Sequence, residues 1–260
     1  MRVKNVLNML DKSSLMDRPS AYRPIRSFVR REGRMTKGQK NALERFWPQY
    51  GLDFQEGYAD LDDVFGRHAP RILEIGMGMG DALVEMAAAH VENDYLGIEV
   101  YRPGIGSLLK KLDARSVTNV RVICEDAVPV LKQMIPDASL DAVYIFFPDP
   151  WPKKRHHKRR LIQKPFAQLL AKKLQSNGVL HLATDWEDYA HHMLAVMNVS
   201  PEFIDTAGQN KFTERPGHRP LTRFEQRGRR LGHRVWDLIF RKAVQDSGIS
   251  NNPNTPSSPQ

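Results

Sequence analysis

The sequence predicts an α/β protein with a doubly wound, mostly parallel sheet and helices on both of its faces. From residue 71 onward, short continuous apolar runs alternate with segments of helical periodicity. Strands that are apolar throughout, rather than at every second residue, are typical of parallel sheets covered on both sides. Glycines and acids follow several of these strands, at the edge where such sheets bind ligands.

The elements follow one another regularly along the chain. The expected strands are Arg71–Ile75, Tyr95–Val100, Val120–Cys124, Leu140–Phe146 and Gly178–Ala183, with a last strand at Val235–Arg241. The expected helices are Asp81–His90, Ser107–Arg115, Val128–Met134, Leu161–Leu174 and Trp186–Met197. This alternation predicts a parallel sheet that helices cover on both faces.

The two ends of the chain lack this alternation. Residues 1–45 are rich in arginine and lysine and show weak apolar periodicity, so we expect a flexible basic arm that nucleic acid can order, or a disordered tail without a role. Residues 46–243 form the predicted domain, and their irregular first part contains several prolines and glycines. Residues 244–260 are rich in serine, asparagine and proline and are expected to be disordered.

Composition limits the kind of partner and compartment. An excess of 39 Lys and Arg over 30 Asp and Glu gives a net charge of +9, which favours a polyanionic partner. The single Cys124 excludes an internal disulfide, and its apolar surroundings favour a small buried side chain over a nucleophile. No signal peptide or membrane-spanning run is evident, so we expect a soluble, cytoplasmic monomer that does not use a membrane.

A glycine-rich turn follows the first strand. Its glycines are Gly76, Gly78 and Gly80, whereas the dinucleotide fingerprint requires a glycine at the place that Asp81 takes. An acid in the first turn of a helix is a poor neighbour for a pyrophosphate. It is compatible with a cofactor that lacks phosphate and carries positive charge, such as S-adenosylmethionine.

Further acids end the neighbouring strands. Glu74 lies at the end of the first strand, Glu99 at the end of the second, and Asp126 after the third. Glu99 can accept hydrogen bonds from ribose hydroxyls, and Asp126 can meet an adenine amino group. Each acid alone could be a helix cap. Together with the glycines they favour an S-adenosylmethionine site, with a nicotinamide site as the alternative.

The most unusual stretch is FFPDPWPKKRHHKRR, after the fourth strand. Pro148 and Pro150 restrict the backbone on both sides of Asp149 and hold it in a stiff turn. Trp151 and a dense basic run follow. A solvated basic loop with a core tryptophan is the simpler alternative for such a run.

These blocks resemble the tRNA (guanine-N7)-methyltransferase family. The resemblance covers roughly Tyr22 to Lys242 and rests on five blocks: LEIGMGMG (Leu73–Gly80), GIEV (Gly97–Val100), FPDPWPKKRHHKRR (Phe147–Arg160), ATDW (Ala183–Trp186) and TRFE (Thr222–Glu225). It implies a class I methyltransferase fold with a seven-stranded Rossmann-like sheet within residues 46–243. It also implies methyl transfer from S-adenosylmethionine to N7 of a guanosine in the variable loop of tRNA.

The resemblance also assigns roles to residues. It implies cofactor binding by Glu74, Gly76, Gly78, Gly80, Glu99, Asp126 and Asp149, and substrate contacts by Lys153, Asp185, Thr222, Arg223, Phe224 and Glu225. It implies RNA contacts by Arg155, His156, His157, Lys158, Arg159 and Arg160. Asp185 and the pair Thr222 and Glu225 have a simpler alternative, because residues of these types also cap helices.

The chemistry explains which catalytic groups are needed. N7 of guanine has a free lone pair and no proton, so no general base is required and alignment of the reactants is the main task. Asp149 is the predicted catalytic residue, because its carboxylate can offset the developing purinium charge and accept hydrogen bonds from guanine. Trp151 could stack on the base. We expect no metal, because His156 and His157 lack acid or cysteine partners at ligand spacing.

Three alternatives belong to other functional classes. Asp81 and the basic charge disfavour a nicotinamide oxidoreductase. The acids at four strand ends disfavour an RNA-binding module that has lost the reaction. The clustered basic residues of 153–160 disfavour a methyltransferase that acts on protein or on a small molecule.

Overall fold

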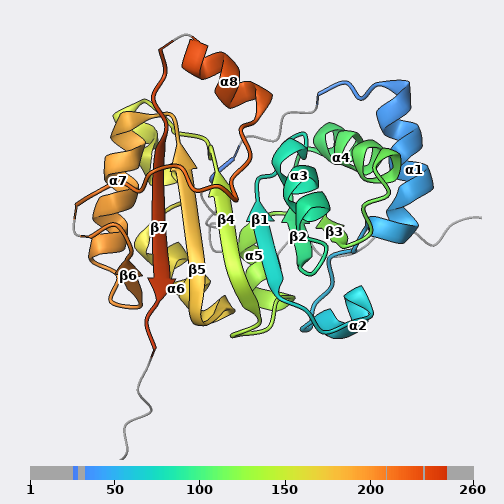
Figure 1. Cartoon of the computed structure of the whole chain (residues 1–260), viewed down its shortest axis with the longest axis horizontal. Coiled ribbons are helices and arrows are strands. Elements are labelled where there is room, and N and C mark those ends of the chain that lie inside the picture. The colour runs from blue at the N-terminus through green and yellow to red at the C-terminus, as the bar shows by residue number, and fades with distance from the viewer. Residues whose placement is uncertain (1–25, 29–32, 209, 231, 245–260) are drawn as a thin grey trace, which may run out of the picture.

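A seven-stranded sheet forms the centre of the computed structural model, which describes residues 26–28, 33–208, 210–230 and 232–244 (Figure 1). The strands are β1 (Arg71–Ile75), β2 (Asp94–Ile98), β3 (Val120–Ile123), β4 (Leu140–Phe146), β5 (Leu174–Thr184), β6 (Phe203–Asp205) and β7 (Trp236–Lys242). Their order is β3-β2-β1-β4-β5-β7-β6, and only β7 pairs antiparallel to its neighbours. The order reverses between β1 and β4, the place where doubly wound sheets bind ligands.

Helices cover both faces of this sheet. One face packs against α1 (Lys37–Tyr50), α3 (Asp81–Ala89) and α4 (Arg102–Ala114), and the other against α5 (Ala127–Gln133), α6 (Lys164–Lys173) and α7 (Glu187–Asn198). Leu73 and Ile75 of β1 pack on the face covered by α5, α6 and α7, and Ile72 packs on the face covered by α1, α3 and α4. Alternate residues of a strand point to opposite faces of the sheet. The predicted doubly wound α/β fold is confirmed.

Two further helices lie at opposite ends of the sheet. Figure 1 shows α8 (Arg223–Arg230) above the end at which the parallel strands finish, and α2 (Leu61–Phe65) at the end where they begin. Among the described residues, no helix is both long and apolar enough to span a bilayer.

The main error of the sequence interpretation lies in α1. The prediction of a flexible arm is wrong for residues 37–45, and the predicted boundary at residue 45 falls inside this helix. Thr36 and Gln39 form a capping box at its start, and Ala42 and Leu43 are buried. The apolar side chains of α1 begin only at Ala42, after a polar first turn, and Pro48 inside the helix made its second half look irregular in the sequence. Residues 1–25, 29–32 and 245–260 of the predicted arm and tail lie outside the described residues.

Smaller differences concern element bounds. The α2 and β6 segments are not predicted by periodicity, since each is too short to show one. The predicted helix Leu161–Leu174 begins later, at Lys164, and a 3-10 helix, η1 (Lys154–Arg159), takes up most of the basic run. Pro165 in the first turn of α6 fits this start, because proline is tolerated where an N–H has no helical partner.

Candidate functional site

A cavity of about 490 Å³ opens at the carboxyl ends of β1, β2, β3 and β4. Five residues predicted to bind the cofactor line it: Gly76, Gly78, Glu99, Asp126 and Asp149. Ser27 and Phe28, from the N-terminal segment, complete its wall. The strand order therefore brings together acids that are far apart in the sequence, at the reversal point of the sheet.

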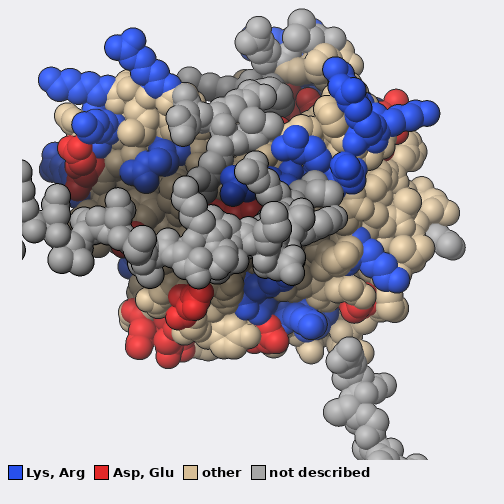
Figure 2. All heavy atoms as spheres, turned by 180° about the vertical axis from the view of Figure 1, so that it is seen from behind, with Lys and Arg blue, Asp and Glu red and all other residues tan. Residues whose placement is uncertain are grey.

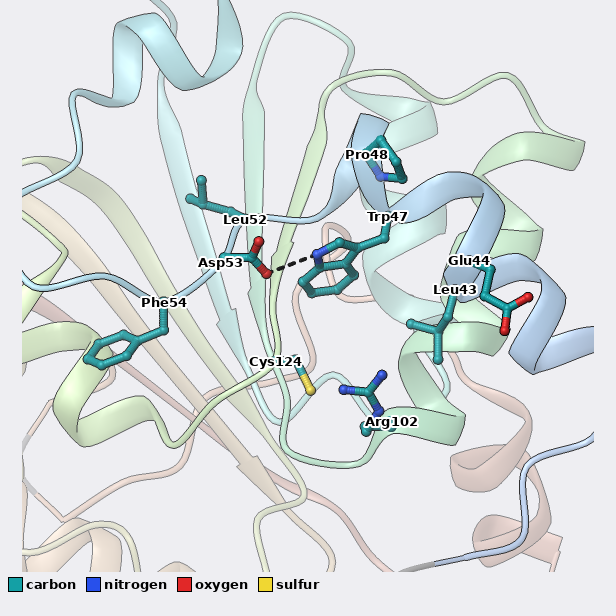
Figure 3. Close-up of a pocket in the computed structure, with 9 residues that line it drawn as sticks. All are labelled: Leu43, Glu44, Trp47, Pro48, Leu52, Asp53, Phe54, Arg102 and Cys124. Atoms are coloured by element: carbon teal, nitrogen blue, oxygen red, sulfur yellow. Dashed lines mark hydrogen bonds between the residues drawn. The ribbon is translucent and has the colours of Figure 1, made fainter. Parts of the chain in front are cut away.

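A second hollow, of about 550 Å³, lies between α1 and the start of α4 (Figure 3). Trp47 donates an indole hydrogen bond to Asp53 on one side of it, and Arg102 and Cys124 lie opposite. None of the predicted site residues lines this hollow. The cavity at the strand ends is therefore the candidate active site.

The glycine-rich turn needs its glycines for two different reasons. Gly78 and Gly80 both have positive φ, 55° and 76°, which side chains other than glycine rarely adopt. A Cβ on Gly80 would also lie 2.5 Å from Leu108 of α4. Gly80 is thus required for packing of α3 against α4, whereas Gly78 presents its backbone to the cavity.

Glu99 holds this turn to the end of β2. Its carboxylate accepts hydrogen bonds from the backbone N–H groups of Gly78 (2.8 Å), Val100 (2.7 Å) and Tyr101 (2.9 Å). Burial raises the pKa of Glu99, although the three backbone N–H groups act in the opposite direction. Glu99, the residue predicted to bind ribose, therefore also holds the glycine-rich turn that lines the cavity.

Glu74 does not line the cavity but is buried next to it. Its side chain is 2% exposed, and no described residue bonds its Oε2 atom. Burial, together with the negative charge of Glu99, raises the pKa of Glu74 to about 8. A buried acid without a partner, beside a second acid, is an arrangement that a bound cation would stabilise.

The pKa of Glu74 predicts a pH-dependent stability. Between its ordinary pKa of 4.5 and about 8, the folded protein keeps a proton that the unfolded chain releases. The free energy of unfolding should therefore fall as pH rises through this window, on the order of 1 kcal/mol per pH unit. Glu74→Gln should remove this slope in urea denaturation curves recorded from pH 5 to 8.

The exposed Glu85 on α3 supplies the control. Glu85→Gln should leave the pH slope unchanged. If the free energy of unfolding depends on pH in Glu74→Gln as it does in the unsubstituted protein, Glu74 is not the source of the slope.

Asp126 combines both roles considered for it in the sequence. Its carboxylate accepts a hydrogen bond from the Val128 N–H at 3.0 Å and so caps α5. The same residue lines the cavity. One oxygen is used by the cap, which leaves the other available to a ligand.

The Asp149 turn is held to the neighbouring strand. Phe147 donates its N–H to the Ala183 carbonyl at 2.8 Å and has a φ of 53°, and Trp151 has a φ of 47°. Such values are unfavourable for bulky residues and are typical of functional turns. Asp149 is exposed toward the cavity, and no described residue donates a hydrogen bond to its carboxylate. Its oxygens are free to interact with a ligand.

Trp151 and Arg159 hold the N-terminal segment at the mouth of the cavity. The Trp151 indole N–H donates to the Ser27 carbonyl at 2.9 Å. The Arg159 guanidinium lies 3.8 Å from the centre of the indole ring and donates to the carbonyls of Arg26 and Phe28. One face of Trp151 is therefore covered, so the predicted stacking on a base would need the other face.

The basic run divides into exposed and buried members. Lys153, Lys154, Arg155 and Lys158 are exposed, whereas His156, His157 and Arg159 are half-buried. On the face seen in Figure 2, lysine and arginine side chains gather on the upper half, the end at which Figure 1 shows α8. The cavity lies at the same end of the molecule, where the parallel strands finish.

Arg160 differs from its neighbours because it is only 3% exposed. It forms an ion pair with Asp188, donates to the Pro150 carbonyl at 3.0 Å, and lies over the Tyr189 ring. Its burial conflicts with the predicted RNA contact. The side chain instead links the Asp149 turn, at the Pro150 carbonyl, to Asp188 of α7.

Of the predicted substrate residues, Lys153, Asp185, Thr222 and Glu225 do not line the cavity, and the side chains of Arg223 and Phe224 are not among those described. Asp185 follows β5, next to the end of β4, and α7 begins after Trp186 without a side-chain cap, so the capping alternative for Asp185 is wrong. Thr222 accepts a hydrogen bond from the Glu225 N–H at 3.2 Å, as the capping alternative predicts. The Glu225 side chain is 2% exposed and pairs with Arg219 and Arg229, which conflicts with a direct substrate contact.

Two features of the site had no signal in the sequence. Ser27 and Phe28 lie in the basic arm, and Arg219 lies in a region of many arginines, so neither pattern indicated a contact with the site. The described residues contain no group of three or more His, Cys, Asp or Glu that could hold a metal ion.

Comparisons with known proteins find relatives over most of the chain. Residues 68–238 match a family model described as a putative methyltransferase. The chain is 57% identical over 224 residues to the tRNA (guanine-N(7)-)-methyltransferase of Sodalis glossinidius (strain morsitans), covering 86% of this chain and 94% of the relative. It is 52% identical over 231 residues to that of Hydrogenovibrio crunogenus (strain DSM 25203 / XCL-2), covering 89% and 96%.

A solved structure supports the fold. The 16S rRNA methyltransferase KamB superimposes with a TM-score of 0.52, over 73% of this chain and 96% of that one. The two sequences are only 11% identical, so this likeness concerns the fold alone.

Proposed function

Because the chain belongs to the tRNA (guanine-N(7)-)-methyltransferase family, we propose that it methylates N7 of a guanosine in the variable loop of tRNA, with S-adenosylmethionine as donor. The observation that carries the proposal is the cavity at the strand ends, where Glu99, Asp126 and Asp149 meet beside a glycine turn. A single chain supplies all of these residues.

The cavity fits a donor that combines a nucleoside with positive charge. Glu99 would accept hydrogen bonds from the ribose hydroxyls, and the uncommitted oxygen of Asp126 would accept one from the adenine amino group. The backbone at Gly76 and Gly78 allows close approach. The unpartnered Oε2 of the buried Glu74 lies next to the cavity, and a cationic ligand there would favour loss of the Glu74 proton. When bound, the donor supplies an electrophilic methyl group on sulfur.

The chemistry at guanine requires orientation more than proton transfer. The N7 lone pair forms the new bond to the methyl carbon, the carbon–sulfur bond breaks, and its electron pair remains on sulfur. No proton leaves N7, so no base is needed. Positive charge moves onto the purine ring, where the exposed Asp149 carboxylate would stabilise it. The same carboxylate would accept hydrogen bonds from the guanine Watson–Crick edge and so disfavour adenine.

The substrate surface would extend from the cavity over η1 and α8. Lys153, Arg155 and Lys158 would contact phosphates, because they are exposed at the end of the sheet that carries the cavity. Asp185 and Thr222 would contact the nucleotides around the target. We assign Arg160 and the Glu225 side chain to the support of this surface rather than to direct contacts.

This division of the basic run gives a testable prediction. Lys158→Ala and Arg155→Ala should each weaken tRNA binding and reduce the slope of log affinity against log salt by about one. Arg160→Ala should leave that slope unchanged but lower turnover and thermal stability, because its contacts are internal. Filter-binding titrations from low to moderate salt measure the slopes. An equal slope change for Arg160→Ala would place its guanidinium on RNA.

The proposed function itself is tested by mapping the product. The protein is incubated with labelled S-adenosylmethionine and tRNA that lacks the modification, and the labelled base is then located. We expect label at N7 of one guanosine of the variable loop, and no label when a tRNA with adenosine at that place is supplied. Label at another atom or loop would overturn the substrate assignment. Stabilisation by NAD, but not by S-adenosylhomocysteine, would overturn the cofactor assignment.

A further inference from the structure

A buried cluster of charged side chains lies beside the site, outside the cavity. We name it the Arg219 cluster, and its members are His181, Arg219, Glu225 and Asp237. The Arg219 guanidinium donates to both oxygens of Asp237, at 2.6 and 2.9 Å, and to both oxygens of Glu225. All four side chains are buried, and Arg219 is only 1% exposed. Such burial makes each contact sensitive to the loss of its partner.

The cluster joins three separate parts of the protein. Asp237 belongs to β7 and Glu225 to α8, so Arg219 ties the helix above the strand ends to the sheet (Figure 1). The guanidinium also lies 5.8 Å from the centre of the Phe147 ring. Phe147 begins the turn that carries Asp149, and its positive φ of 53° depends on its surroundings. One side chain therefore connects α8, β7 and the turn of the predicted catalytic residue.

The hydrogen bonds of the cluster are satisfied on all sides. His181 Nε2 lies 2.8 Å from Asp237 Oδ1, and its Nδ1 lies 3.1 Å from His218 Nε2. Burial acts to raise the pKa of Asp237, but the hydrogen bonds from His181 and Arg219 hold it below its ordinary value. The cluster thus keeps Asp237 ionised and fixed in position.

We propose that Arg219 is a positioning residue, which holds α8 and the Asp149 turn in a fixed relative orientation, and that Glu225 acts on the reaction through Arg219. This inference rests on the proposed function, since it explains how residues Thr222–Glu225 support the tRNA site. A Glu225 side chain paired at both oxygens with a buried guanidinium cannot also contact the substrate. Its function is to hold the helix, and the helix presents Thr222 to the substrate.

A double-mutant cycle tests the inference. The variants are Arg219→Met, Glu225→Gln and the double substitution, with Arg115→Met as control because Arg115 is exposed at the end of α4, outside the cavity and the proposed substrate surface. We expect Arg219→Met to lower kcat/KM for tRNA at least 100-fold and to change the dissociation constant of S-adenosylhomocysteine less than twofold. The double variant should have the same kcat/KM for tRNA as Arg219→Met, because both substitutions remove the same contact between Arg219 and Glu225. Arg115→Met should retain normal turnover.

Several outcomes separate this role from the alternatives. If the losses from the two single substitutions multiply in the double variant, Glu225 contacts the substrate independently and the inference is wrong. If S-adenosylhomocysteine binding falls in parallel with turnover, Arg219 supports the whole fold and the inference is also wrong. Should Arg219→Met fail to fold, Arg219→Lys and Asp237→Asn are measured in its place, with the same criteria. The unsubstituted protein reports on the proposed function separately, through its own methylation of tRNA.

Discussion

Asp149→Ala is expected to lower the turnover of tRNA methylation by about 100-fold to 1,000-fold, the range typical for loss of a group that stabilises transition-state charge. The carboxylate lines the cavity, is exposed, and accepts no hydrogen bond from a described residue. It is therefore free to oppose the charge that develops on the purine. Single-turnover rates with saturating donor measure the effect on the chemical step.

The affinity for tRNA should stay largely intact in the same variant. Most of the binding free energy for RNA comes from phosphate contacts, and these lie on the basic run rather than on Asp149. Asp149→Asn keeps the size of the side chain and removes its charge, so it separates electrostatic stabilisation from shape. A variant Asp149→Ala that kept most of its turnover would refute the catalytic assignment.

The sheet and the position of the cavity could be predicted because they depend on local pattern. Arg71–Ile75 and Leu140–Phe146 are mostly apolar, and the structure has β1 and β4 with these bounds. Acids that follow parallel strands meet at one edge whatever the details of packing. Glu99, Asp126 and Asp149 consequently line the cavity as predicted.

The exact role of single charged residues could not be predicted in the same way. Arg159 and Arg160 are neighbours in one basic run, yet Arg159 lies over Trp151 and Arg160 is buried against Asp188. The sequence shows which residues are charged, but not which of them forms an ion pair with a carboxylate that is distant in the sequence. Glu225 is a similar case, because its partner Arg219 is one of many arginines in that region.

Glu99→Gln is expected to weaken the binding of S-adenosylhomocysteine by at least about 100-fold, which corresponds to roughly 3 kcal/mol. In the unsubstituted protein, Oε1 accepts the N–H groups of Val100 and Tyr101, and Oε2 accepts that of Gly78. A glutamine amide has only one acceptor atom, so its NH₂ group must face a backbone N–H on one of the two sides. An unsatisfied buried donor costs about 1–3 kcal/mol, and the glycine turn loses its attachment to β2.

Calorimetric titration with S-adenosylhomocysteine measures this loss, and thermal unfolding shows how much of it reflects stability. Asp126→Asn is the informative comparison, because an asparagine oxygen can still cap α5 at the Val128 N–H. We expect Asp126→Asn to lose less affinity than Glu99→Gln, since it disturbs a ligand contact without opening the turn. Equal affinity of Glu99→Gln and the unsubstituted protein would mean that the glycine turn holds its shape without Glu99, and that the ribose is bound elsewhere.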